Sequence, residues 1–137
     1  MRQLSVVILA AGKGERMLSS KPKVMHEIMG KPMVGYVVER AQELSPINTV
    51  VVLGYGKEKV REYIKGFDIV TAIQRGQKGT AHAVLSAEKP VKGHDVLVLY
   101  GDVPLIESST LKGFLNFFQK AGTVTFMTTD VMNPTGY

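Results

Sequence analysis

The chain has 137 residues, 45% of them hydrophobic, which is typical of one globular domain or part of one rather than of a disordered chain. It contains no cysteine, which excludes disulfides and thiolate metal sites. Its net charge of +5 suits a polyanionic ligand, although many basic domains bind none. It shows neither a signal-peptide pattern nor an apolar run of membrane length, so we expect a cytoplasmic protein that does not insert into membranes.

Short apolar runs that end at glycine or polar residues predict strands, and apolar residues at helical spacing predict helices. In chain order, the predicted elements are a strand over residues 4–9, a helix over 32–44, a strand over 49–53, a helix over 57–65, a strand over 69–73, a helix over 80–87, a strand over 95–102, a helix over 109–121 and a strand over 123–128. This alternation predicts an α/β fold with a Rossmann-like, doubly wound, mostly parallel sheet.

The order of the strands decides which loops meet. In the commonest doubly wound order the first strand lies between the second and the fourth, and a crevice opens there at the carboxyl ends of the strands. The loop after the first strand contains "LAAGKGERMLSSKPK" (9–23), and the loop after the fourth contains "YGDVP" (100–104). We therefore expect these two loops to face each other across one crevice.

The first of these loops is rich in glycine and in basic residues. It does not match a dinucleotide-binding fingerprint, because Met17 occupies the third glycine position and no acidic residue ends the second strand. It does not match a phosphate loop of the Walker type either, because Gly14 occupies the hydroxyl position. A loop whose backbone amides and two cations, Arg16 and Lys23, bind phosphates fits the residues. The alternative is an ordinary turn with solvated lysines.

Two further segments carry polar residues at the predicted crevice. Asp102 follows a fully apolar strand and is placed to hold magnesium against phosphate oxygens, unless it only caps local amides in a turn. The segment "QRGQKGTAHA" (74–83) leads into a helix, and the amides of Gln74 and Gln77 suit the edge of a nucleobase, or they cap the helix. We interpret His82, on that helix, as structural rather than catalytic.

Four segments of the chain, "LAAGKGERM", "PKVMHEIMGKPM", "QKGTAHAV" and "YGDVPL", resemble the signature segments of sugar-1-phosphate nucleotidylyltransferases. In this order they most resemble the N-terminal uridylyltransferase domain of bifunctional enzymes that make UDP-N-acetylglucosamine. The resemblance covers the whole chain and implies the N-terminal part of a nucleotide-diphospho-sugar transferase fold. This family usually has threonine where Glu15 stands, so an additional acid lies near the phosphate loop here.

The resemblance also implies roles for individual residues. Arg16, Lys23 and Asp102 would be catalytic, and Asp102 would ligate Mg²⁺. Residues 9–12 would lie against the nucleotide, and the triphosphate would contact Arg16 and Lys23. The implied substrate-binding residues are Leu9, Ala10, Ala11, Gly12, Lys23, Gln74, Gly79, Thr80, Tyr100, Gly101 and Asp102.

Within that set, Gln74, Gly79 and Thr80 would recognise uracil and its ribose, and Tyr100 and Gly101 would approach the sugar phosphate. The implied reaction transfers a uridylyl group from UTP to N-acetylglucosamine 1-phosphate, which gives UDP-N-acetylglucosamine and pyrophosphate for cell-wall precursors such as those of peptidoglycan. The partners are therefore small molecules and not nucleic acid.

The same resemblance implies that residues 1–137 are the nucleotide-binding half of a longer domain. A sugar-binding half and a β-helix domain, which forms homotrimers in the bifunctional enzymes, would lie outside them, and we expect the 137 residues alone to be inactive. Another sugar-1-phosphate nucleotidylyltransferase stays open as an alternative, and so does a UTP-binding module without activity. A metal-dependent glycosyltransferase fits less well, because it usually has an Asp-x-Asp pair where Gly101 and Val103 flank Asp102.

Overall fold

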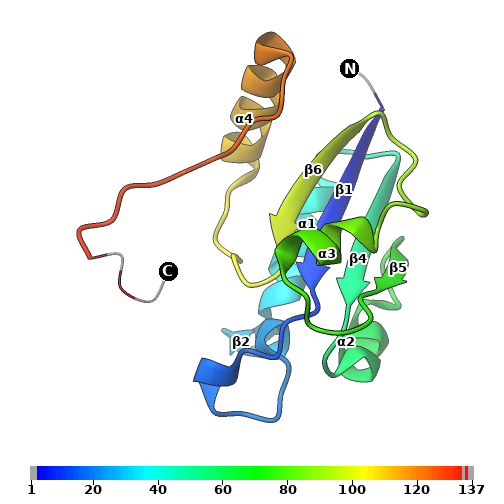
Figure 1. Ribbon diagram of the computed structural model, residues 1–137, viewed down its shortest axis with the longest axis vertical. Helices are drawn as coiled ribbons and strands as arrows, with labels where there is room; N and C mark the ends of the chain where they lie inside the picture. The colour runs from blue at the N-terminus through cyan, green and yellow to red at the C-terminus, as the bar shows by residue number, and fades with distance from the viewer. Residues whose placement is uncertain (1–2, 134, 136–137) are drawn as a thin grey trace. The chain divides into compact units, whose positions relative to one another are not determined.

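The computed structural model describes residues 3–133 and 135. The chain divides into two compact units, Met1–Ile106 and Glu107–Tyr137, each of which is considered by itself. The first unit contains a parallel sheet with helices, and the second contains a helix followed by irregular chain (Figure 1).

The sheet of the first unit has the strand order β5-β4-β1-β6, and every neighbouring pair is parallel. Its strands are β1 (Leu4–Ala10), β4 (Asn48–Leu53), β5 (Val70–Ile73) and β6 (Asp95–Tyr100). β1 lies between the second and fourth predicted strands, so the Rossmann-like α/β fold and its predicted strand order are confirmed. Because all strands run in the same direction, the loops that follow β1 and β6 leave the sheet at the same edge (Figure 1).

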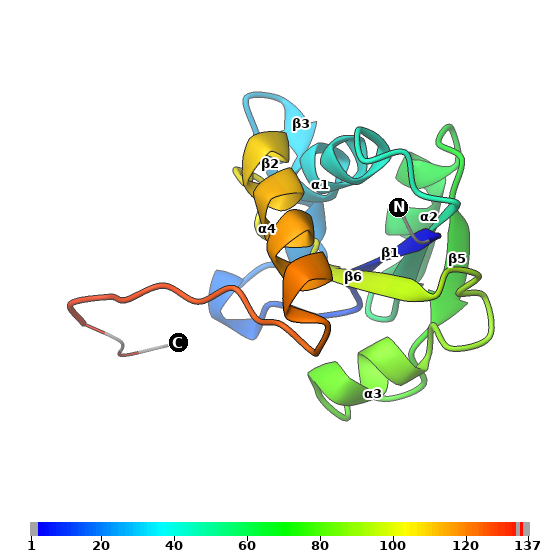
Figure 2. The ribbon, with the colours of Figure 1, turned by 90° about the horizontal axis from the view of Figure 1, so that it is seen from above.

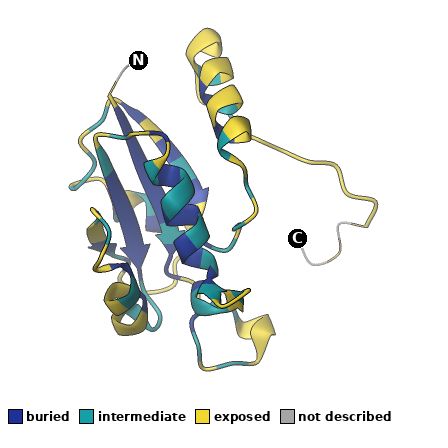
Figure 3. Ribbon diagram, turned by 180° about the vertical axis from the view of Figure 1, so that it is seen from behind, coloured by how far each residue is buried: buried dark blue, intermediate teal, exposed yellow. Residues whose placement is uncertain are grey.

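Helices lie on both sides of this sheet. Figure 2 shows α1 (Met33–Gln42) and α2 (Lys57–Ile64) on one side and α3 (Thr80–Leu85) on the other. The side chains of the two central strands, β1 and β4, are therefore buried on both faces, which explains why these strands are continuous apolar runs (Figure 3). The cluster that includes residues of α3 and the turn after it contains Val7, Ala11, Val50, Val52, Ala72, Ala83 and Ala87. No helix within the described residues is long and apolar enough to cross a bilayer.

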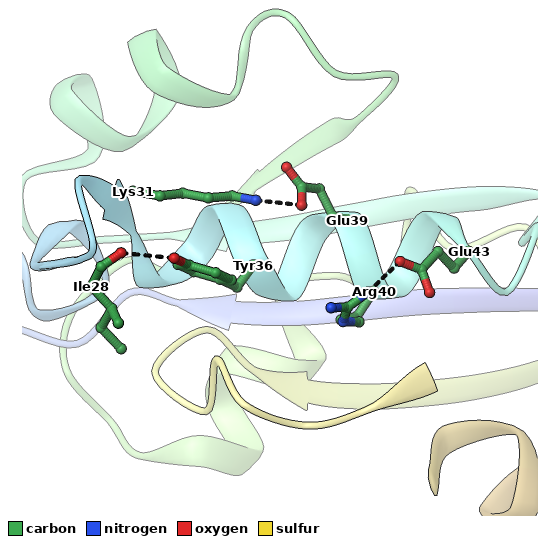
Figure 4. A network of polar contacts seen from close by, with 6 residues as sticks. All are labelled: Ile28, Lys31, Tyr36, Glu39, Arg40 and Glu43. Atoms are coloured by element: carbon green, nitrogen blue, oxygen red, sulfur yellow. Dashed lines mark hydrogen bonds and ion pairs between the residues drawn. The ribbon is translucent and has the colours of Figure 1, made fainter. Parts of the chain in front are cut away.

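A small antiparallel hairpin, β2 (Glu27–Ile28) and β3 (Lys31–Pro32), precedes α1 and was not predicted. Its strands are too short to show a period in the sequence. The hydroxyl of Tyr36 on α1 donates to the carbonyl oxygen of Ile28 at 2.7 Å, and Lys31 forms an ion pair with Glu39 (Figure 4). The hairpin is thus fixed by contacts to the next helix rather than by its own length.

A buried hydroxyl holds the amino-terminal edge of the sheet together. Ser5, on β1, is fully buried and donates to Oδ1 of Asn48 on β4. Its Oγ accepts hydrogen bonds from the backbone N–H groups of Lys92, at 3.2 Å, and Gly93, at 2.7 Å, in the loop before β6. Nδ2 of Asn48 donates to the carbonyl oxygen of Pro90 at 2.7 Å. The Ser5 side chain therefore connects β1 to β4 and to the loop before β6. These contacts lie at the amino-terminal edge of the sheet, opposite the edge from which the loops after β1 and β6 leave.

The second unit contains α4 (Ser108–Ala121), which ends where Gly122 adopts a positive φ of 65° and donates its N–H to Phe118. The predicted strand over 123–128 is wrong, because these residues form neither helix nor strand. Val124 and Phe126 are 75% and 81% exposed. Alternating apolar residues indicate which face of a strand would be buried, but a strand also needs a hydrogen-bonded neighbour, and the described residues supply none here.

Replacing Ser5 with alanine should lower the free energy of unfolding of the first unit by about 1–3 kcal/mol, because two backbone N–H groups lose their buried acceptor and Asn48 loses a donor. Urea denaturation followed by circular dichroism measures this change. Ser20→Ala is the control, because Ser20 is exposed, and it should change stability by no more than about 0.5 kcal/mol. Equal stability of the two variants would contradict the role assigned to Ser5.

Candidate functional site

A pocket of about 240 Å³ opens at the carboxyl edge of the sheet. Its walls come from the loop after β1, the 3₁₀ turn Lys23–Met25, the segment that joins β5 to α3, and the end of β6. The residues that line it are Leu9, Ala11, Gly12, Lys23, Val24, Gln74, Gln77, Gly79, Thr80, Ala83, Tyr100 and Asp102. The structure therefore brings together in one pocket segments that lie up to about ninety residues apart.

Most of the substrate-binding residues implied by the sequence resemblance line this pocket, but three of the implied site residues do not. Ala10 is 1% exposed and belongs to the core, because alternate residues of β1 point to opposite faces. Gly101 is buried and donates its N–H to the carbonyl oxygen of Leu9 at 2.9 Å. Arg16 lies in the exposed 3₁₀ turn Glu15–Met17, outside the pocket lining.

Two glycines allow the loops to approach closely at this edge. Gly14 has a φ of 67°, and a Cβ atom built on it would lie 2.6 Å from Cβ of Lys23. A Cβ atom on Gly101 would lie 2.9 Å from the carbonyl oxygen of Leu9. A side chain at position 14 would displace Lys23, and one at position 101 would separate β6 from β1. The glycines thus position the pocket residues rather than forming its lining.

The central polar contact of the pocket is an ion pair between Lys23 and Asp102. The Nζ atom lies 2.6 Å from Oδ2, and the side chains are 37% and 26% exposed. Asp102 lies just beyond the end of β6, in a turn where the N–H of Val103 donates to the carbonyl oxygen of Tyr100 at 3.2 Å. The predicted strand over 95–102 therefore ends at Tyr100, and the turn directs the carboxylate toward the basic loop, as the sequence led us to expect.

Asp102 is the only carboxylate among the residues that line the pocket. The described residues contain no group of three or more His, Cys, Asp or Glu side chains that could hold a metal without other ligands. This donor set fits Mg²⁺, because that ion is usually bound by one or two carboxylates together with substrate phosphates and water. Asp102 would supply one carboxylate ligand.

Two glutamine side chains connect the segment after β5 to its surroundings. Gln74 is 6% exposed, and its backbone N–H donates to the carbonyl oxygen of Leu53 at 2.8 Å. Its Nε2 lies 3.0 Å from the carbonyl oxygen of Gly79 and 3.1 Å from Nδ1 of His82. Nε2 of Gln77 donates to the carbonyl oxygen of Ala11 at 2.9 Å, which joins this segment to the loop after β1.

Val24, Gln77 and Ala83 line the pocket but were not among the implied site residues. Gln77 had a signal, because it is the second amide of the polar segment 74–83. Val24 and Ala83 had none, since an apolar residue beside a pocket cannot be distinguished by its type from one in the core. Glu15 does not line this pocket but a second hollow, together with Lys13 and Tyr55.

The comparisons with known proteins agree with this geometry. Residues 6–136 match the family model of the MobA-like NTP transferase domain. The chain is 51% identical over 134 residues to the bifunctional protein GlmU of Alcanivorax borkumensis, a match that covers 98% of this chain and 29% of that protein. The chain therefore spans less than a third of the length of this relative.

Solved structures share the fold. A nucleotidyl transferase from Methanothermobacter superposes with a TM-score of 0.75 at 22% identity, over 83% of this chain and 57% of that one. A UDP-glucose pyrophosphorylase in complex with UDP-glucose superposes with a TM-score of 0.72 at 26% identity, over 89% and 55%. A protein from Mycobacterium tuberculosis in complex with manganese superposes with a TM-score of 0.70 at 18% identity, over 87% and 60%.

The family model covers nearly the whole chain. The chain therefore belongs to the family of MobA-like NTP transferase domains.

Proposed function

We propose that the protein transfers a uridylyl group from UTP to N-acetylglucosamine 1-phosphate, with Mg²⁺, to give UDP-N-acetylglucosamine and pyrophosphate. The observation that carries this proposal is the Lys23–Asp102 ion pair in a pocket that also contains the Gln74–Thr80 segment. The high identity to GlmU and the fold shared with a UDP-glucose pyrophosphorylase support it. The four sequence motifs favour the N-acetylglucosamine substrate.

Lys23 and Asp102 have complementary roles in this proposal. Lys23 binds the triphosphate, and Asp102 would hold a divalent ion, which would supply positive charge at the phosphates. Because both side chains are partly exposed, their ion pair is worth only about 0.2–1 kcal/mol, so exchanging it for a nucleotide and a metal is inexpensive. The pair thus holds both groups near the place where the phosphates bind.

Other residues would bind the remaining parts of the substrates. Leu9, Ala11 and Gly12 lie against the nucleotide, and Gln74, Gly79 and Thr80 recognise uracil and its ribose. Tyr100 approaches the sugar phosphate from the end of β6. Arg16 lies outside the pocket lining, and we keep it as a proposed phosphate ligand because a guanidinium can hold two phosphate oxygens at once.

The chemistry suits this set of residues. A phosphate oxygen of the sugar phosphate forms a bond to the α-phosphorus of UTP, and the bond from that phosphorus to the bridging oxygen breaks as pyrophosphate leaves. The attacking oxygen is already anionic at neutral pH, so no strong general base is required. A bound divalent ion supplies charge neutralisation at the phosphates. The protein's contribution is to position the reactants and to place positive charge beside the departing pyrophosphate.

We also propose that residues 1–137 correspond to the nucleotide-binding half of the transferase domain. In this proposal, sugar-binding residues and a second metal ligand come from sequence beyond residue 137. A β-helix domain in the same polypeptide would make the assembly a homotrimer. The product would serve cell-envelope synthesis in the cytoplasm.

The proposed function is tested by measuring pyrophosphate release from UTP by the full-length protein, across a panel of sugar phosphates and with or without magnesium. We expect release that requires N-acetylglucosamine 1-phosphate and a divalent ion. Release that requires a different sugar phosphate would show that the protein is a nucleotidylyltransferase with another substrate. UTP binding without any release would contradict the proposed activity.

Replacing Asp102 with asparagine should lower turnover about a hundredfold or more while UTP binding changes little, because the charge toward the metal is lost and the shape is kept. UTP binding without metal should stay equal or tighten, since Lys23 loses its competing carboxylate. Steady-state kinetics and calorimetry measure these effects. The control Asp68→Asn removes an exposed aspartate outside the pocket lining and should behave like the wild type. Normal turnover in Asp102→Asn at ordinary magnesium would exclude the metal role.

Replacing Lys23 with alanine should weaken UTP binding roughly tenfold to a hundredfold, because a hydrogen bond to a charged phosphate is lost. The matched control is Lys21→Ala, two residues away, where the lysine pairs with Glu27 at 3.5 Å and does not line the pocket. Titration calorimetry of both variants gives the comparison. Equal losses in both would show that only general positive charge is required.

Arg16 is tested by a pair of substitutions. Arg16→Ala should lower the kcat/KM for UTP, and Arg16→Lys should restore it only in part, because an ammonium group lacks the two-pronged geometry of guanidinium. Steady-state kinetics of both variants measure the effect. Wild-type kinetics in Arg16→Ala would show that Arg16 does not bind the phosphates of UTP.

A further inference from the structure

The side-chain amide of Gln74 is held in one orientation by two neighbours. Its nitrogen lies 3.0 Å from the carbonyl oxygen of Gly79, and a carbonyl oxygen only accepts hydrogen bonds. The amide group that faces Gly79 must therefore be the NH₂, and the carbonyl oxygen Oε1 must lie on the other branch. Gly79 reaches this place with a φ of 91° and a ψ of 179°, a conformation that favours glycine.

The second neighbour is His82, on α3. Its Nδ1 lies 3.1 Å from the same nitrogen of Gln74. Since Gly79 already fixes this nitrogen as the donor, Nδ1 of His82 must be the acceptor, and the imidazole proton must reside on Nε2. Both N–H groups of the Gln74 amide are thus used inside the protein. The one hydrogen-bonding atom of this side chain that is left for a ligand in the pocket is the acceptor Oε1.

We propose that His82 is a positioning residue that, together with the Gly79 carbonyl, locks the Gln74 amide so that it presents only an acceptor to the base and thereby selects uracil over cytosine. This proposal rests on the proposed function of the pocket as a UTP site. The sequence indicated that His82 is structural rather than catalytic. In this proposal His82 does not contact the substrate, but it affects which base binds because it orients the Gln74 amide.

The selectivity follows from the edges of the two bases. Uracil presents a donor at N3, which matches a fixed acceptor, whereas cytosine presents an acceptor at N3. If the amide were free to turn over, its NH₂ could face cytosine equally well. Turning it over in the protein would place Oε1 against the Gly79 carbonyl oxygen, and it would also require the His82 proton to move from Nε2 to Nδ1. Because Gln74 is nearly fully buried, water does not relieve the contact between the two oxygens.

Two variants at position 82 separate this role from simple packing. His82→Phe keeps a planar ring of similar size but removes the acceptor. His82→Asn is smaller, but its side-chain oxygen can take the place of Nδ1. A purely structural histidine would be replaced better by phenylalanine, whereas a positioning histidine would be replaced better by asparagine.

The experiment is a nuclear magnetic resonance titration of the ¹⁵N-labelled protein and both variants with UTP and with CTP, which detects weak as well as tight binding. We expect the wild type to prefer UTP by about tenfold or more. His82→Phe should lower this preference about fivefold, through weaker UTP and stronger CTP binding, and His82→Asn should keep it within about twofold. A preference that is unchanged in His82→Phe, or lost equally in both variants, would overturn the proposal.

A second measurement does not depend on variants that fold. Long-range ¹H–¹⁵N spectra of the wild type without nucleotide report the tautomer of His82, and we expect the proton on Nε2. A proton on Nδ1 would overturn the proposed lock. If the wild type binds neither nucleotide, the proposed function fails. If it binds UTP but the tautomer or the variants behave otherwise, only the role of His82 fails.

Discussion

The pairing of β1 with a parallel strand on each side is the constraint on which the pocket depends. Leu9 pairs with Val52 on one side and with Tyr100 on the other. The hydrogen bonding continues past the strand ends, because Gly101 donates to Leu9 and Tyr55 donates to the carbonyl oxygen of Ala11. Loops that are far apart in the sequence are therefore held by backbone hydrogen bonds to a common central strand.

The pocket contains a positive and a negative side chain next to each other, rather than a group of charges of one sign. Lys23 and Asp102 come from opposite walls and neutralise each other, while both keep part of their surface in water. Separating a fully buried ion pair would cost much more free energy. Without an ion pair, the two side chains would not be held next to each other. A partly exposed pair is suited to a site that must accept a cation and a polyanion together.

The sequence predicted the part of the structure that depends on continuous local patterns. The apolar runs of β1, β4, β5 and β6 predicted a buried parallel sheet, and the usual winding order placed the loop after β1 opposite Asp102. The hairpin before α1 was missed because its formation depends on Tyr36 and Lys31 contacts rather than on a pattern of its own. The strand over 123–128 was predicted wrongly because an apolar alternation does not reveal whether a neighbouring strand exists.

The sequence could predict those residues of the candidate site whose side-chain type indicates a chemical role. Charged and amide side chains at strand ends could be singled out, whereas Val24 and Ala83 could not. Ala10 was implied to bind substrate through a motif, but the alternation of side chains along β1 places it in the core. The contact between Gln74 and His82 depends on how the segment after β5 folds back on α3, which no spacing in the sequence specifies.

A crystal structure of the protein grown with UTP and magnesium shows whether Lys23 and Asp102 exchange their ion pair for the nucleotide and the metal ion. We expect the nucleotide in the pocket at the carboxyl edge of the sheet, with Nζ of Lys23 at a phosphate oxygen and Asp102 at the metal ion, so that the two side chains no longer pair. A nucleotide bound elsewhere, or bound in this pocket with the Lys23–Asp102 ion pair intact, would contradict it.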